Sequence, residues 1–258
     1  MQAETAYGPD WRDAAAYAPL LDADRSLFAW EWLRRDPNYC AAADRSLQAR
    51  TGMADAAFAA EHFGLVALEP PRLAVPNGRP LWRSDVHPFV LPVDFCRAAS
   101  SALDEVDMVQ VQELARTIVE DGVEHLLLSD GLRSIRLDGP PGAFTGGPIC
   151  LRYSIEGLIA AERPLLTLRR FLALCRTGHF SRSLHAREAR ARRWIIMLRA
   201  YDGLIADADQ RRIAQELFRG SVAEPRWRTR ESSVRSQVQR LVRSARWFAA
   251  GGYRSLLR

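Results

Sequence analysis

The chain has 258 residues and a formal net charge of +5, with 48% hydrophobic and 26% charged residues, a composition that is typical of globular proteins and excludes disordered or collagen-like chains. Its longest apolar runs, such as residues 194–198, are far shorter than the roughly 20 residues of a membrane-spanning helix, and its first residues lack the basic region and apolar stretch of a secretory signal. We therefore expect a cytoplasmic protein with two domains, since one domain usually has on the order of 100 to 200 residues.

The net charge is the sum of two opposed halves. Residues 1–150 contain 13 arginines and 22 acidic residues, a net charge of −9, whereas residues 151–258 contain 23 arginines and 9 acidic residues, a net charge of +14. The chain contains no lysine, so each of these cations is a guanidinium, whose donors match phosphate groups and guanine edges. A basic half of this size usually faces a polyanion.

The N-terminal region has the pattern of a small helical domain at residues 1–68. Apolar residues recur at helical spacing over residues 11–21, a second helix begins after Asp24 and ends before Pro37, and a third spans residues 54–63. The large aromatic residues of this region are expected in its core, because a small domain needs the area that they bury. These residues are Trp11, Tyr17, Phe28, Trp30, Trp32 and Tyr39.

A proline-rich segment follows, with six prolines between residues 69 and 92. Proline excludes regular helix there. We therefore expect residues 69–104 to form an extended linker or a covering arm.

The middle of the chain contains one expected strand pair. Residues 105–121 have the apolar spacing of a helix. Residues 125–128 and 132–137, joined by a turn at Gly131, have the pattern of a hairpin. The predicted fold is mainly α with this small β-hairpin.

Residues 105–258 form the predicted C-terminal domain, which is helical and basic from residue 151 onward. One helix is expected to begin near Pro164 and to end just before Gly178, and another spans residues 186–201. One face of the first helix carries Leu165, Leu168, Leu172 and Cys175.

Residues 207–250 have the pattern of a helix-turn-helix. A capping box that begins at Asp207 opens a short helix, and a last helix spans residues 231–250. The usual connection between such helices has about 3 to 4 residues, whereas 13 residues separate Phe218 from Ser232. We therefore expect a variant of the motif.

The last helix has an apolar stripe on one side and small polar residues with arginines on the other. Polar residues early in the helix suit base edges in the major groove, and arginines before and after them suit phosphates. The residues expected to read bases are Ser232, Arg235, Ser236 and Gln239. Those expected to bind phosphates are Arg226, Arg228, Arg230, Arg240, Arg243 and Arg246. The solvated face of a basic protein would show the same pattern, but the local charge density favours DNA.

Enzyme and metal motifs do not occur in the sequence. The four cysteines lie 25 or more residues apart, so none of them are spaced for zinc or thiol exchange. Neither G-x-S-x-G nor H-E-x-x-H is present. Glu105 and Asp107, the alternative as catalytic carboxylates, suit the first turn of a helix. We expect no enzyme activity, no cofactor and no metal.

Both ends of the chain resemble known families. The string WRDAAAYAPLLDADRSLFAWEWLRRDPNY resembles a small transcriptional regulator-like domain of certain proteobacterial proteins. The segments LLLSDGLRSIRL, LTLRRFLAL, QRRIAQELF, VRSQVQRLVR and GGYRSLLR are similar to the long-uncharacterised domain that follows it. Together they resemble the FseA-type transcriptional activators of integrative and conjugative elements, which switch on excision and transfer genes.

The resemblance implies a variant helix-turn-helix that binds promoter DNA through the outward positions of the last helix, with RNA polymerase and a protein antiactivator as further partners. Similar domains occur alone as antiactivators, which bind the activator rather than a promoter. The alternative function is therefore a protein-interaction regulator, whose basic domain docks an acidic partner or its own acidic N-terminal half. RNA binding is disfavoured because the basic half lacks closely spaced aromatic residues for stacking.

Overall fold

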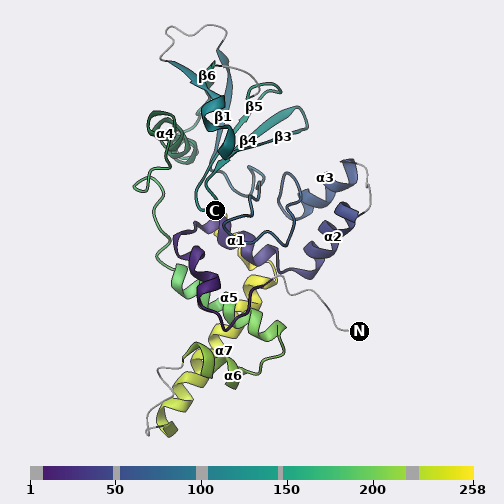
Figure 1. Cartoon of the computed structure of the whole chain (residues 1–258), viewed down its shortest axis with the longest axis vertical. Coiled ribbons are helices and arrows are strands. Elements are labelled where there is room, and N and C mark those ends of the chain that lie inside the picture. Colours follow the sequence, from purple (N-terminus) through teal and green to yellow (C-terminus); the bar gives the residue numbers. More distant parts are fainter. Residues whose placement is uncertain (1–7, 49–52, 97–103, 145–147, 219–226) are drawn as a thin grey trace. The chain divides into compact units, whose positions relative to one another are not determined.

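The computed structural model describes residues 8–48, 53–96, 104–144, 148–218 and 227–258 (Figure 1). Contacts divide the chain into two compact units. One, which we call the helical unit, combines Met1–Thr51, Pro70–Val75 and Arg187–Leu257. The other, which we call the sheet unit, combines Gly52–Glu69, Pro76–Ala186 and Arg258. Each unit is thus assembled from segments that are far apart in the sequence.

The helical unit draws its helices from both ends of the chain. They are η1 (Ala15–Asp22), α1 (Arg25–Leu33), α2 (Pro37–Gln48), α5 (Ala191–Ile205), α6 (Gln210–Leu217), α7 (Trp227–Ala249) and η5 (Gly252–Leu256). Asp24 caps α1 as expected, because its carboxylate accepts a hydrogen bond from the Leu27 amide at 3.0 Å. Pro37 does not end the helical region but begins α2, a position where proline loses no hydrogen bond.

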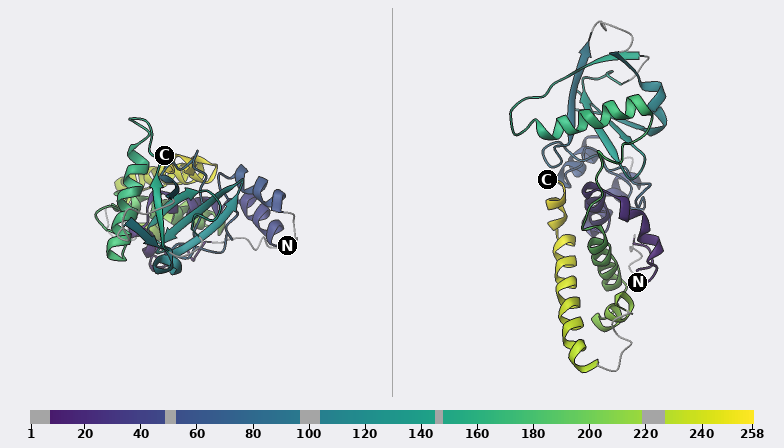
Figure 2. Two further views of the ribbon diagram at one scale, coloured as in Figure 1. Left: turned by 90° about the horizontal axis from the view of Figure 1, so that it is seen from above. Right: turned by 90° about the vertical axis from the view of Figure 1, so that its left-hand side faces the viewer.

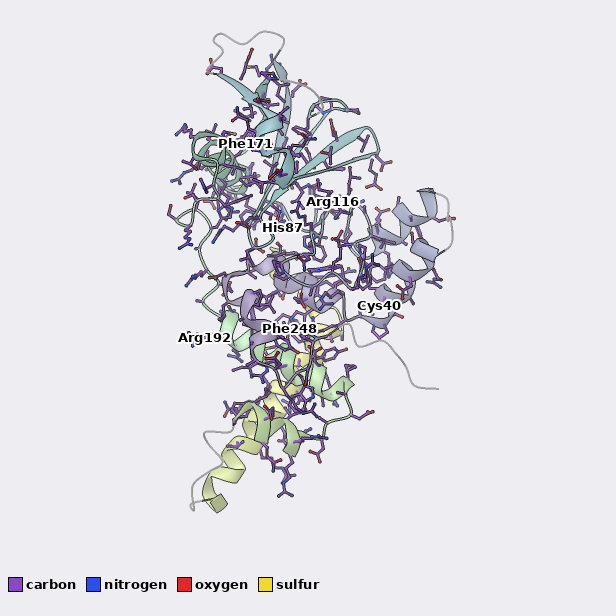
Figure 3. All side chains as sticks on the ribbon, viewed as in Figure 1. Cys40, His87, Arg116, Phe171, Arg192 and Phe248 are labelled. Atoms are coloured by element: carbon purple, nitrogen blue, oxygen red, sulfur yellow. The ribbon has the colours of Figure 1, made fainter. Side chains whose placement is uncertain are left out.

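The six N-terminal aromatic residues are all buried, which confirms that prediction. Trp32 of α1 stacks on Phe248 of α7 with ring centroids 5.4 Å apart, and it meets Tyr201 of α5 edge-on at 5.6 Å. Phe28 of α1 meets Trp194 of α5 edge-on at 5.0 Å. Figure 3 labels Phe248 at this junction. The N-terminal helix α1 therefore packs directly on two C-terminal helices.

The sheet unit contains a curled, mixed sheet of six strands, so the expectation of a mainly α fold with a small hairpin is wrong. The strands are β1 (Val90–Cys96), β2 (Glu105–Asp107), β3 (Ala115–Glu120), β4 (Val123–Ser129), β5 (Ser134–Gly139) and β6 (Pro148–Tyr153). Their order is β2-β6-β1-β5-β4-β3, in which β1 and β5 are parallel and the other neighbours antiparallel. The predicted hairpin is present as β4 and β5, paired from Ser129 with Ser134 onward.

The other strands were not predicted, because local features of the sequence there favour other structures. The expected helix at residues 105–121 is instead β2, the 3-10 helix η3 (Met108–Leu114) and β3. In β1, Pro92 argues against a central strand, because proline cannot donate a backbone hydrogen bond. The strand tolerates it by changing partners there: residues up to Pro92 pair with β5, and residues from Val93 onward pair with β6.

Two helices and an irregular segment complete the sheet unit, namely α3 (Met53–His62), α4 (Glu162–Thr177) and the chain before β1. Phe171 and Leu174 of α4 are buried against one face of the sheet, where Figure 2 shows α4 lying across the strands and Figure 3 labels Phe171. On β4, Leu127 packs instead with Val66 and Leu81 of the irregular segment. Both faces of the central strands are therefore covered.

The ends of α4 agree with the sequence, but its buried face does so only in part. Gly178 ends the helix in the left-handed conformation, with φ 69°, as expected for a C-terminal glycine. Leu168 and Cys175 pack against the core, whereas Leu165 is 49% exposed. In the ranges that the structure describes, no helix combines the length and apolar character needed to cross a membrane.

Candidate DNA-binding site

Helices α5, α6 and α7 pack around one small core in the helical unit (Figure 2). The buried residues of this core are Trp11, Ala200, Ala208, Ile213, Val238 and Val242. Trp11 comes from the N-terminal segment, and Arg199 of α5 holds that segment by donating to the carbonyl oxygens of Trp11 at 2.8 Å and Arg12 at 3.1 Å. The three-helix core is therefore completed by a residue from the other end of the chain.

The turn between α5 and α6 is short and well defined. Asp209 caps α6, because its carboxylate accepts a hydrogen bond from the Arg212 amide at 2.7 Å. The sequence predicted Asp207 as the cap, and this prediction is wrong. Asp207 instead lies within the turn and has a left-handed φ of 55°. Residues 206–209 separate the two helices, and this is the connection length that is typical of a helix-turn-helix.

Helix α7 has the two faces that its sequence predicts. Val238, Val242 and Ala245 are buried on the core side. The predicted contact residues whose side chains are described lie on the opposite side and are all exposed. These are Arg235, Ser236, Gln239, Arg240, Arg243 and Arg246.

The helix begins earlier than expected, at Trp227 instead of residue 231. Only residues 218–226 therefore connect α6 to α7, a shorter connection than the 13 residues counted from the sequence. Arg228, Arg230 and Ser232 belong to the first turns of α7, where the backbone but not the side chains is described. Arg226 lies outside the described residues.

Helix α6 adds polar groups that the sequence analysis did not assign to DNA. Arg211, Arg212 and Gln215 are exposed, whereas Ile213 is fully buried on the core side. The sequence could have indicated this surface, because the helical spacing of QRRIAQEL places the two arginines and Gln215 away from Ile213.

The exposed arginines of α6 and α7 are not neutralised locally. No carboxylate of the described residues pairs with any of Arg211, Arg212, Arg235, Arg240, Arg243 or Arg246. The helical unit as a whole contains 23 arginines and 15 acidic residues, a net charge of +8. Guanidinium groups in this state offer hydrogen-bond donors and positive charge to an incoming polyanion.

Other arginines of the same unit are used in its interior. Arg35, two residues after the end of α1, donates to both carboxylate oxygens of Asp202 in α5, at 2.7 Å and 2.8 Å. Arg35 also pairs with Glu31, which accepts a hydrogen bond from Arg34 at 2.9 Å. The Tyr17 hydroxyl donates to Asp202 at 2.6 Å. We call these five residues the buried network; it ties α1 and η1 to α5.

Burial alone would disfavour charge on Glu31 and Arg35, but their ion pairs outweigh it, whereas at Arg34 burial prevails and lowers the pKa. Burial would raise the pKa of Glu31, yet Arg35 and Arg34 hold this pKa below its ordinary value. Burial would likewise lower the pKa of Arg35, yet Asp202 and Glu31 raise it. Burial and the neighbouring Asp202 raise the pKa of Tyr17, so its hydroxyl stays protonated and donates the hydrogen bond to Asp202. Glu31 and Arg35 are therefore charged, and the Tyr17 hydroxyl is protonated, at neutral pH.

We also considered metal binding and thiol reactivity in the described residues. No group of three or more histidine, cysteine or acidic residues that could hold a metal ion occurs in the described part of the chain. Burial raises the pKa of Cys40 and of Cys175 to about 11, which disfavours the reactive thiolate. The chemistry that this surface offers is hydrogen bonding and charge from arginine.

Two family models match parts of the chain. Residues 157–258 match the model described as "T6SS, Transcription factor, DNA binding domain". Residues 10–66 match the model described as "Proteobacterial transcriptional regulator-like domain". No curated protein and no solved structure matches the chain. The two matches identify a transcriptional regulator with a DNA-binding domain, and α5, α6 and α7 lie within the matched DNA-binding region.

Proposed function

We propose that this transcriptional regulator binds duplex promoter DNA with α7 in the major groove, and that it activates the excision and transfer genes of an integrative and conjugative element. The observation that supports DNA binding through α7 is its exposed face of arginines and small polar residues, in a region that matches a DNA-binding family. Activation of mobile-element genes rests on the resemblance of the chain to FseA-type activators. Such a regulator acts in the cytoplasm, where bacterial DNA lies.

The position of the proposed base-reading residues along α7 suits this part of the helix for the groove. With 23 residues, the helix is about 35 Å long. Near its C-terminal end Phe248 is buried against Trp32 of α1, so the last turns of the helix are anchored in the core. The proposed base-reading residues lie before these turns, between residues 232 and 239, and a major groove about 12 Å wide admits a helix. These residues are Ser232, Arg235, Ser236 and Gln239.

Phosphate contacts would surround this reading face. The proposed contacts on and before α7 are Arg226, Arg228, Arg230, Arg240, Arg243 and Arg246. We add Arg211 and Arg212 of α6, which are exposed and not paired with a described carboxylate. Such contacts supply most of the affinity and make it strongly dependent on salt, because each neutralised phosphate releases counterions.

A titration of the full-length protein on promoter fragments from its own element tests this function, with random duplex as competitor and at several salt concentrations. Gln239→Ala should reduce the preference for the promoter by roughly 1 to 3 kcal/mol, as expected for a lost base contact. Gln237→Ala is the matched control: this exposed glutamine leaves the same helix on another side. If Gln239→Ala left the preference for the promoter unchanged, the placement of α7 in the major groove would be contradicted. If random DNA abolished the complex, specific binding would be contradicted.

Transcription in vitro tests the activator role separately from binding. Adding the protein to RNA polymerase and an element promoter should increase transcript yield, and a protein antiactivator should reverse the increase. Binding without a change in yield would contradict activation.

A further inference from the structure

We propose that the exposed indole of Trp247 on α7 packs against the sugar–phosphate backbone of the DNA, at the edge of the groove that the base-reading residues enter. The contact deepens the proposed function and rests on it. It assigns a ligand to an aromatic side chain that belongs neither to the base-reading set nor to the phosphate-binding set. Because sugar and phosphate are the same at every base pair, this contact adds affinity without sequence preference.

Trp247 is unusually exposed for a tryptophan of this protein. It is 55% exposed, whereas the other tryptophans whose side chains are described are at most 5% exposed. Its neighbour Phe248 is buried against Trp32 of α1. A large aromatic side chain outside the core forgoes the stabilisation that burial supplies, and its apolar surface is available to a ligand.

The backbone after α7 fixes the position of this ring. Gly251 turns the chain with a left-handed φ of 101°, and Gly252 then begins η5 and lies against the indole. A β-carbon at Gly252 would lie 2.5 Å from both Cδ2 and Cε3 of Trp247, so glycine alone leaves room for the ring. The ring also meets Phe248 edge-on, with centroids 4.9 Å apart. The indole is therefore positioned before a ligand arrives, which reduces the entropy that binding costs.

Trp247 continues the exposed face of α7 that the proposed DNA contacts occupy. Four exposed residues recur at i, i+4, i+7 and i+11, the spacing that places helical residues on one face. They are Ser236, Arg240, Arg243 and Trp247. Neither of the two arginines pairs with a described carboxylate. On its own helix the ring is therefore aligned with cations that are available to phosphates.

The charge of this part of the chain favours DNA as the ligand. Residues 232–258 contain six arginines and no acidic residue. The helices packed against α7 contribute Glu31, Asp202 and Glu216, of which the first two belong to the buried network. Asp36, after α1, accepts a backbone hydrogen bond at the start of α2. A segment with cations of one sign around an exposed ring suits a polyanion that also offers apolar sugar surface.

The distance along α7 places Trp247 at the wall of the groove. It lies eight residues after Gln239, which is about 12 Å along the helix axis. The major groove is about 12 Å wide, and a straight helix leaves the curved groove after a few turns. A helix that holds Gln239 at base edges therefore brings the indole to the backbone. There the ring packs on deoxyribose while Arg243 and Arg246 bind neighbouring phosphates.

Titrations of the full-length protein on promoter and random duplexes, at several salt concentrations, test the contact. Trp247→Ala should weaken binding to both duplexes about tenfold. The slope of log affinity against log salt should not change, because an uncharged contact releases no counterions. Trp247→Phe should restore most of the affinity, since a phenyl ring also packs on the sugar. Phe58→Ala is the matched control: this aromatic residue of α3 is 76% exposed and lies outside the matched DNA-binding region.

Three results of these titrations would overturn the contact. They are unchanged affinity of Trp247→Ala, a loss of affinity confined to the promoter, and a change of salt slope as large as that of an arginine variant. A wild type that binds no duplex would contradict the proposed function as well, whereas unchanged binding by Trp247→Ala contradicts this contact alone. Circular dichroism melting establishes that the variants are folded.

Gly252→Ala tests the positioning of the ring. The added methyl group would displace the indole, so the substitution should weaken binding to both duplexes in the wild type. It should have no further effect in Trp247→Ala, where the ring is absent. Equal losses in both backgrounds would mean that Gly252 acts on the backbone and would overturn its role as a positioning residue.

Acrylamide quenching of tryptophan fluorescence tests the contact in the wild type. The difference between the wild type and Trp247→Phe isolates the signal of Trp247. Saturating promoter duplex should protect this signal from acrylamide, because the backbone covers the ring. Unchanged quenching would overturn the contact. Protection by RNA polymerase but not by DNA would assign the ring to a protein and would also overturn it.

Discussion

Two regions of the helical unit use the same side chain in opposite ways. Between α1 and α5, Arg34 and Arg35 are almost completely buried and both pair with carboxylates. On α6 and α7, arginines such as Arg211 and Arg243 are exposed and have no carboxylate partner among the described residues. The first set holds the core together, and the second is available to a ligand. A count of arginines therefore overstates the surface that can bind DNA, because only cations left without an internal partner can neutralise phosphates.

Arg35→Ala tests the buried region and should have the largest effect. The substitution leaves the carboxylates of Glu31 and Asp202 buried without this partner, which usually costs about 3 to 5 kcal/mol of unfolding free energy. Urea unfolding followed by tryptophan fluorescence measures the loss. Arg187→Ala in the same unit is the control: its side chain is 75% exposed and pairs with Asp22, whose side chain is 38% exposed, and surface pairs contribute about 0 to 1 kcal/mol. Equal losses of unfolding free energy in both variants would contradict the distinction between buried and exposed arginines.

Glu31→Gln sharpens the comparison through pH. Because the ion pairs lower the pKa of Glu31 in the folded state, the charged carboxylate stabilises the fold above its unfolded pKa of about 4.3. This contribution is lost as the pH falls through the lowered folded pKa. The stability difference between wild type and Glu31→Gln should therefore be largest near neutral pH and shrink in acid. Urea unfolding of both proteins over a pH series measures it, and a difference that does not change with pH would refute it.

Arg211→Ala and Arg212→Ala test the exposed region and should have the smallest effects. Each should reduce the slope of log affinity against log salt by about 1 and weaken all DNA sequences alike. Neither should change the unfolding free energy by more than about 0.5 kcal/mol, since both sites are on the surface. Arg72→Ala, another exposed arginine of the helical unit, is the control. If Gln215→Ala changed promoter preference, base reading would involve α6 as well as α7.

The compact units do not coincide with the regions that the family models match. Trp11 lies in the first matched region, at residues 10–66, but packs with Ile213 and Val238 of the second. Arg35 and Asp202 join the same two regions. A truncation of residues 1–70 would remove Trp11 and α1 from the core, so it would test folding rather than docking of the basic domain on the acidic N-terminal half.

Several features of this protein follow from the sequence alone. The cap at Asp24, the left-handed end of α4 at Gly178, the β4–β5 hairpin and the two faces of α7 all agree with the prediction. Each depends on residues that are close together in the chain, as in a capping hydrogen bond to the third following residue or the periodicity of one helix. Local signals of this kind remain readable because their partners are adjacent in the sequence.

The tertiary structure alone decided the sheet and the two roles of arginine. β1 becomes a strand only through its pairing with β5 and β6, which lie tens of residues farther along the chain, and its proline hides it from local rules. Arg35 finds Asp202 at a separation of 167 residues, and in the sequence nothing distinguishes it from the arginines of α7. Pairing between distant segments depends on which surfaces meet after the chain has folded. That physical fact separates an arginine that builds the core from one that can bind DNA.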